Sequence, residues 1–89
     1  MYKYVIDFLS AVVFVYVILD TGNPLAIGAT LALLYLLIQS LNLIPCINPA
    51  VVIAYASAGK IPTSEIIPYI LVEIFGGLVA LEIFKRVKL

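Results

Sequence analysis

The chain has 89 residues, of which 65% are hydrophobic and 11% are charged, with a formal net charge of zero and a mean hydropathy of +1.24. This composition excludes an ordinary soluble domain and predicts an integral membrane protein in contact with the lipid bilayer. The five basic residues are scattered, which argues against a nucleic-acid partner, and a single cysteine allows no disulfide within the chain.

Residues 4–19 form the first predicted transmembrane helix, which is short but extendable toward the amino terminus. Asp7 lies within its first two turns. One interpretation places this carboxylate at the headgroups, and the other turns it inward to accept hydrogen bonds from the backbone of residues 43–48, because ionisable groups inside a span usually face the bundle interior. Two features argue against a cleaved signal peptide. Asp7 interrupts the apolar run, and no small-residue cleavage pattern follows it.

A second predicted span covers residues 25–42, after a turn-forming stretch at residues 20–24. Gly28 and Ala32 are four residues apart and give this span a face of small side chains. Such faces let two helices approach closely in a membrane, so we expect a neighbouring helix there.

Residues 43–58 interrupt the apolar pattern and predict a pore loop followed by a half-length helix. Asn48 is a good N-cap and Pro49 a good first helical residue, because proline's missing N–H has no partner in the first turn anyway. The helix should end near residues 57–58, before Gly59. About ten residues span about 15 Å, half of a hydrocarbon core of about 30 Å.

Pro45 cannot continue the preceding helix regularly, so the loop should leave backbone carbonyls unpaired. At membrane depth this is tolerated only beside a water-filled cavity or inside protein. Cys46 is either lumen-facing or buried as a small apolar side chain. Ala54 belongs to a face of alanines on the half-helix that we expect to pack against a span. The residues assigned to the pore are Ile44, Pro45, Cys46, Ile47, Asn48, Pro49 and Ala50.

The third predicted span covers residues 66–84, with Thr63 or Ser64 as its N-cap. Glu73 lies well inside this span, where a charged carboxylate costs a few kcal/mol, so it should turn inward toward the pore loop, as Asp7 should. Small residues one turn later, Gly76 and Gly77, should permit close helix packing.

These segments resemble the major intrinsic protein (aquaporin) family. The motif Ile-Asn-Pro-Ala-Val at residues 47–51 is similar to the family signature, and residues 68–77 are similar to its Tyr-x-x-Ala-Gln-x-x-Gly-Ala segment, with Glu73 in place of glutamine. Residues 6–10 are similar to the family's opening Ala-Glu-Phe-Leu-Gly, with Asp7 in place of the buried glutamate. The resemblance covers essentially the whole chain but only one half of that fold, a unit of three spans and one half-helix.

Two departures from the family pattern bear on function. Residues 43–46 replace the family's Ser-Gly-Ala-His, which removes small residues and a histidine from the loop. Val51 follows the motif, as in the family's first half, whereas the second half carries a filter-forming arginine there. The resemblance therefore implies an all-helical half-unit without the family's usual filter.

The predicted function is a passive channel for water or small neutral solutes. Free N–H groups and the dipole of the half-helix would place about half a positive charge at the bilayer centre, and Asn48 would donate a hydrogen bond to the solute. The alternative is a structural or accessory membrane protein that conducts nothing. No nucleophile, histidine or metal-ligand cluster joins the carboxylates, so neither an enzyme nor a cofactor or metal is expected.

One half-helix reaches only midway across a bilayer, so a through-pore needs a second one from the opposite side. The basic residues divide into two on one side of the predicted spans and three on the other, which gives almost no preferred orientation. We therefore expect an antiparallel homodimer, or an assembly of such dimers, with an axis in the membrane plane.

Overall fold

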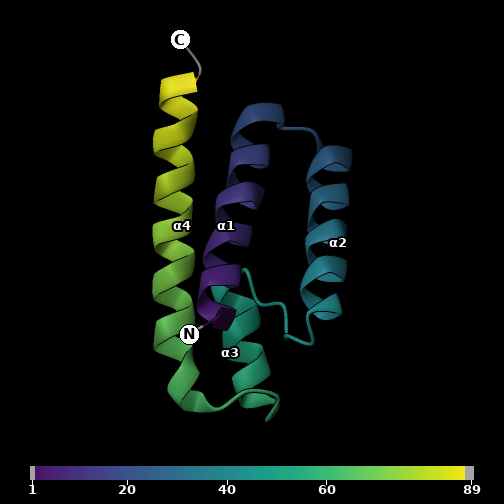
Figure 1. Cartoon of the computed structure of the whole chain (residues 1–89), viewed down its shortest axis with the longest axis vertical. Helices are drawn as coiled ribbons and strands as arrows, with labels where there is room; N and C mark the ends of the chain where they lie inside the picture. The colour runs from purple at the N-terminus through teal and green to yellow at the C-terminus, as the bar shows by residue number, and fades with distance from the viewer. Residues whose placement is uncertain (1, 88–89) are drawn as a thin grey trace.

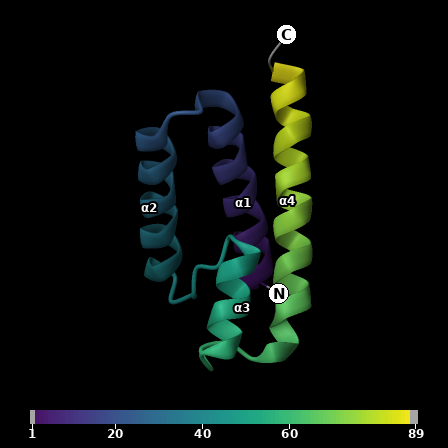
Figure 2. The ribbon, with the colours of Figure 1, turned by 180° about the vertical axis from the view of Figure 1, so that it is seen from behind.

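The computed structural model describes residues 2–87 and is all-helical over that range. The elements are α1 (Tyr2–Thr21), α2 (Pro24–Ser40), α3 (Pro49–Ser57), the 3-10 turn η1 (Thr63–Glu65) and α4 (Ile66–Val87). Figure 1 shows α1 between α4 and α2, with the short α3 beside the lower part of α4, and Figure 2 shows the same arrangement from behind. No strand occurs between residues 2 and 87, and the predicted all-helical class is confirmed.

Within residues 2–87, two segments are long and apolar enough to cross a membrane, judged by length and composition. They are α1, with 20 residues, and the 25 residues of η1 and α4 taken together. At 1.5 Å per residue α1 is about 30 Å long, the thickness of a hydrocarbon core. The apolar helix α2 is shorter, with 17 residues.

The turn between α1 and α2 is built by the residues that the sequence indicated. Gly22 adopts a φ of +58°, which glycine tolerates without steric cost. Asn23 then caps α2, its side chain accepting hydrogen bonds from the N–H groups of Leu25 at 2.8 Å and Ala26 at 3.2 Å. The helix α1 extends through Thr21, so the turn is shorter than the predicted residues 20–24.

The start of α4 differs from the prediction. Neither Thr63 nor Ser64 is the N-cap, because both residues lie inside η1, whose cap position is the extended Pro62 and which has no side-chain cap. Glu65 instead forms an ion pair with Lys3 at the start of α1. This pair joins the two helices at the end of the molecule where both begin.

The most extensive contact between helices in the fold is that between α1 and α4. Gly76 makes it possible, because a Cβ atom at this position would lie 2.8 Å from Ala11 Cβ and 2.9 Å from the Phe8 carbonyl oxygen. The close packing expected at Gly76 is therefore present. At Gly77 the same hypothetical atom meets only Val15, at 3.8 Å, which is an ordinary contact.

The small-residue faces of α2 and α3 remain open in the single chain. Gly28 has nothing within 4 Å of a Cβ position, and Ala32 is exposed, so the neighbour expected there is absent within the chain. Ala54 is also exposed, so no described span packs against its face, and the packing expected for that face stays a prediction. The opposite face of α3, with Val52 and Ala56, is buried instead. Burying Val52 removes more apolar area from solvent than burying Ala54 would.

Candidate pore loop

The loop after α2 folds back into the molecule before α3 begins. In Figures 1 and 2 the chain leaves the lower end of α2, rises between the helices, and then descends through α3 to the end where α4 starts. The nine residues of α3 make it about 14 Å long. The N-terminus of α3 therefore lies partway along the molecule, at its surface, and its C-terminus lies at the end where α1 begins.

Asn48 caps α3 as predicted. Its side-chain oxygen accepts a hydrogen bond from the Ala50 N–H at 2.8 Å, and its carbonyl accepts from Val51 and Val52 at 3.0 and 3.1 Å. The expectation of free N–H groups here is wrong, because Pro49 has none and the next three are bonded. With its oxygen used by the cap, the exposed Asn48 side chain offers its amide N–H groups to other partners.

Ile47 adopts a backbone conformation that its sequence does not predict. Its φ is +59°, which is rare for a β-branched residue and costs about 1–2 kcal/mol. The N–H of Asn48 donates to the carbonyl of Cys46, which closes a three-residue γ-turn around Ile47. This turn sets the direction in which the chain leaves the loop and enters α3.

Asp7 supports that turn directly. Its Oδ1 atom accepts a hydrogen bond from the Ile47 N–H at 2.8 Å, and the residue is only 3% exposed. The structure thus decides between the two interpretations of Asp7 in favour of the inward one. A bond across 40 residues fixes the strained turn against α1.

Glu73 turns inward from α4 but does not hydrogen-bond the loop. It is 5% exposed, and neither of its oxygens has a hydrogen-bond partner among the described residues. It lines a pocket of about 220 Å³ together with Asn48 and Pro49, and its carboxyl group interacts with that of Asp7. Glu73 therefore lies beside the start of α3.

The side chains of the loop mostly point into the protein. Cys46 is fully buried in an apolar cluster with Val52, Ala56, Ile61 and Tyr69. Its thiol is therefore not exposed in the single chain, which favours the buried interpretation over the lumen. Pro45 and Ile47 are buried as well, whereas Ile44 is exposed.

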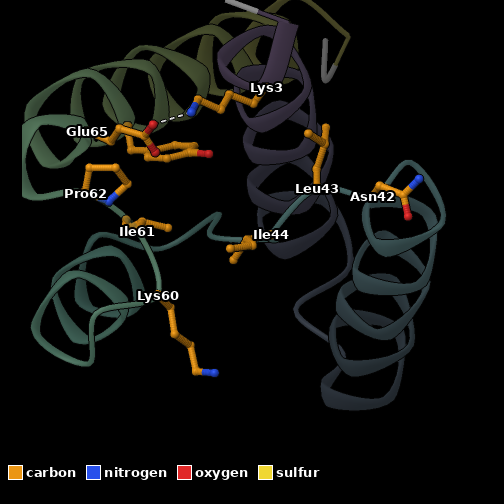
Figure 3. A pocket seen from close by; sticks show the side chains of 9 residues that line it. Lys3, Asn42, Leu43, Ile44, Lys60, Ile61, Pro62 and Glu65 are labelled. Atoms are coloured by element: carbon orange, nitrogen blue, oxygen red, sulfur yellow. Dashed lines mark hydrogen bonds and ion pairs between the residues drawn. The ribbon is translucent and has the colours of Figure 1, made fainter.

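A pocket of about 230 Å³ opens near the start of α1 and was not predicted from the sequence. Figure 3 shows Lys3 and Glu65 paired on one side, Ile44 projecting toward its centre, and Lys60 and Pro62 along its rim. The sequence feature that could have indicated it is the pair of opposite charges, Lys3 and Glu65, at the starts of α1 and α4. The pocket gives the loop an opening to one end of the molecule.

Comparisons of the chain with protein-family models, with curated proteins and with solved structures find no match. The interpretation of the loop therefore depends on its own geometry.

Proposed function

We propose that the chain is one half of a membrane channel for water or small neutral solutes. On this proposal α1, α2 and α4 cross the bilayer, and α3 is a re-entrant half-helix whose N-terminus lies near the midplane. The proposal includes a relationship to the aquaporin family, based on the motif at residues 47–51.

The observation that carries the proposal is the position of Asn48. A half-length helix starts at this residue partway along the molecule, and a buried hydrogen bond between Asp7 and Ile47 holds the preceding turn. The cap leaves the Asn48 amide as a donor, and the dipole of α3 adds partial positive charge at the same point. A donor beside positive charge suits a water or hydroxyl oxygen and disfavours cations.

Two antiparallel copies would complete the pathway. Each α3 of about 14 Å covers half of a core of about 30 Å, so two of them, entering from opposite sides, would bring their Asn48 residues together. The open small-residue faces at Gly28 and Ala54 support such an assembly, because they let a second copy approach closely.

The test is osmotic swelling of proteoliposomes that contain purified protein, compared with empty liposomes. Asn48→Ala should abolish water flux, and Asn23→Ala is the matched control. Both asparagines cap a helix that begins with proline, so each substitution should cost about 1 kcal/mol of stability. Equal loss of flux in both variants, or full flux in Asn48→Ala, would refute the role of Asn48.

The same preparation distinguishes the structural alternative. An assembled oligomer whose liposomes swell no faster than empty ones would identify a non-conducting module.

The orientation of the chain in the membrane is tested with a cysteine appended after the last residue, in a Cys46→Ala background. The measurement is the fraction of this cysteine that an impermeant thiol reagent labels on intact cells. About half of the molecules should react if the chain inserts both ways. Reaction of nearly all or nearly none would show a single orientation, and the partner would then need a different sequence.

A further inference from the structure

The contact between Asp7 and Glu73 is the feature that the proposed function does not use. Asp7 comes from α1 and Glu73 from α4, the two helices that pack closely at Gly76, and their carboxyl groups lie close enough to interact. The residues are 3% and 5% exposed. Three of the four oxygens, Asp7 Oδ2 and both of Glu73, have no hydrogen-bond partner among the described residues.

Two ionised carboxylates cannot satisfy each other. Both are then acceptors only, so no hydrogen bond can form between them, and like charges repel strongly where water is excluded. A single proton changes this, because a protonated carboxyl donates to the facing oxygen and one of the two negative charges disappears.

Among residues 2–87 no cationic side chain interacts with the pair in place of this proton. The titratable groups that interact with the two carboxyls are the Cys46 thiol from the loop, Tyr35 from α2 and Tyr69 from α4. None of them is basic. Lys3 is paired with Glu65 at the end of the molecule. From α3 the pair receives only the partial positive charge of the helix N-terminus.

We infer that Asp7 and Glu73 form a proton-binding site in which one shared proton, carried by Glu73, holds the Ile47 turn in place. Glu73 is the carrier because the Ile47 N–H donates to Asp7 and favours its ionised form. The Glu73 hydroxyl then donates to Asp7 Oδ2, so Asp7 is fixed between α4 and the loop. Loss of the proton leaves two facing charges, releases Asp7 and loosens the turn that leads to Asn48.

Infrared titration of the purified protein tests the proton itself, and it does not depend on conduction. The wild type should show the carbonyl band of a protonated carboxyl at neutral pH, and Glu73→Gln should lack it. Glu82→Gln is the matched control, because Glu82 lies on the same helix but is exposed beside Lys85 and Arg86. No such band in the wild type, or a band of unchanged size in Glu73→Gln, would overturn the inference.

Two further measurements test the sharing and its competitor. In Asp7→Asn the asparagine oxygen can still accept from Ile47, and the facing charge is gone, so the band should disappear at lower pH than in the wild type. An unchanged titration would show that the proton is not shared. A wild-type band that appears only when Na⁺ is removed at constant pH would show that a metal cation, not a proton, occupies the site.

The effect on the loop is measured through Cys46, which the folded loop buries. The ratio of its thiol-labelling rates in the wild type and in Glu73→Gln cancels the intrinsic pH dependence of the thiol. This ratio should be near one while the proton is bound and rise roughly tenfold once it is lost, since a hydrogen bond to a charged group is then released. A ratio that stays constant across the infrared titration would refute the link between the proton and the turn.

Discussion

The contact at Gly76 offers a sharp test of the fold, because the next residue is also glycine and provides its control. In Gly76→Ala the new methyl group would lie 2.8 Å from Ala11 Cβ and 2.9 Å from the Phe8 carbonyl oxygen. Carbon atoms in contact prefer about 3.5–4.0 Å. The Phe8 oxygen belongs to the helix backbone and cannot rotate away, so α1 and α4 must separate by up to about 1 Å.

The expected loss of stability follows from two opposing effects. Forcing a methyl group into a packed interface costs about 1–3 kcal/mol, and replacing a helical glycine by alanine returns about 1 kcal/mol. Gly76→Ala should therefore be destabilised by up to about 2 kcal/mol. Gly77→Ala meets only Val15 at 3.8 Å, so it should keep the propensity gain and be at least as stable as the wild type.

Thermal unfolding of both variants in the same detergent, followed by circular dichroism, measures the difference. Separation of the helices would also pull Asp7 away from Ile47, so Gly76→Ala should expose Cys46 to thiol reagents more than Gly77→Ala does. Equal stability of Gly76→Ala and Gly77→Ala would refute the close packing of α1 against α4 at Gly76.

Three further outcomes are expected. The Cys46 thiol should resist labelling in folded wild-type protein at neutral pH and react completely after denaturation; rapid labelling of the folded state would contradict its burial. A double-mutant cycle with Lys3→Met and Glu65→Gln should give a coupling of about 0.2–1 kcal/mol that weakens with salt, because the pair is partly exposed; a larger, salt-independent value would show a buried pair. Gly28→Ala should raise the stability of the monomer by up to about 1 kcal/mol but weaken association; a less stable monomer would show that this position is already packed.

The parts of the fold that depend on local chemistry were predictable from the sequence. Asn48 and Pro49 fix the start of α3 because capping and the missing N–H act within one turn. Gly59, with a φ of +78°, ends the same helix, as its position indicated. For Asp7 the sequence left two interpretations open, and the inward one holds because a carboxylate inside an apolar segment needs a buried partner.

The parts that failed depend on contacts between distant segments. Ile47 is the strongest case, because nothing in an isoleucine indicates a positive φ, and the conformation persists only with the surrounding structure to hold it. The buried face of α3 was also not predictable, since α3 carries small residues on one face and Val52 on the other, and only tertiary packing decides between them. Thr63 was a reasonable cap locally, but the 3-10 turn η1 begins at Thr63, so the cap position falls on Pro62.

The exposed side chain of Asn48 needs a hydrogen-bond partner from outside the single chain. On the proposed topology its amide lies near the middle of the bilayer, where a polar group facing lipid without a hydrogen bond would cost several kcal/mol. The cap satisfies the oxygen of the side chain and leaves the amide N–H groups, so water or a second protein surface must accept from them. On that topology α3 begins directly after Asn48 and reaches only to the middle of the bilayer. Contact with water and contact with a second protein surface therefore both require an assembly that covers this side of the loop. A channel and a non-conducting module therefore both predict oligomers, and only the flux through the assembled protein separates them.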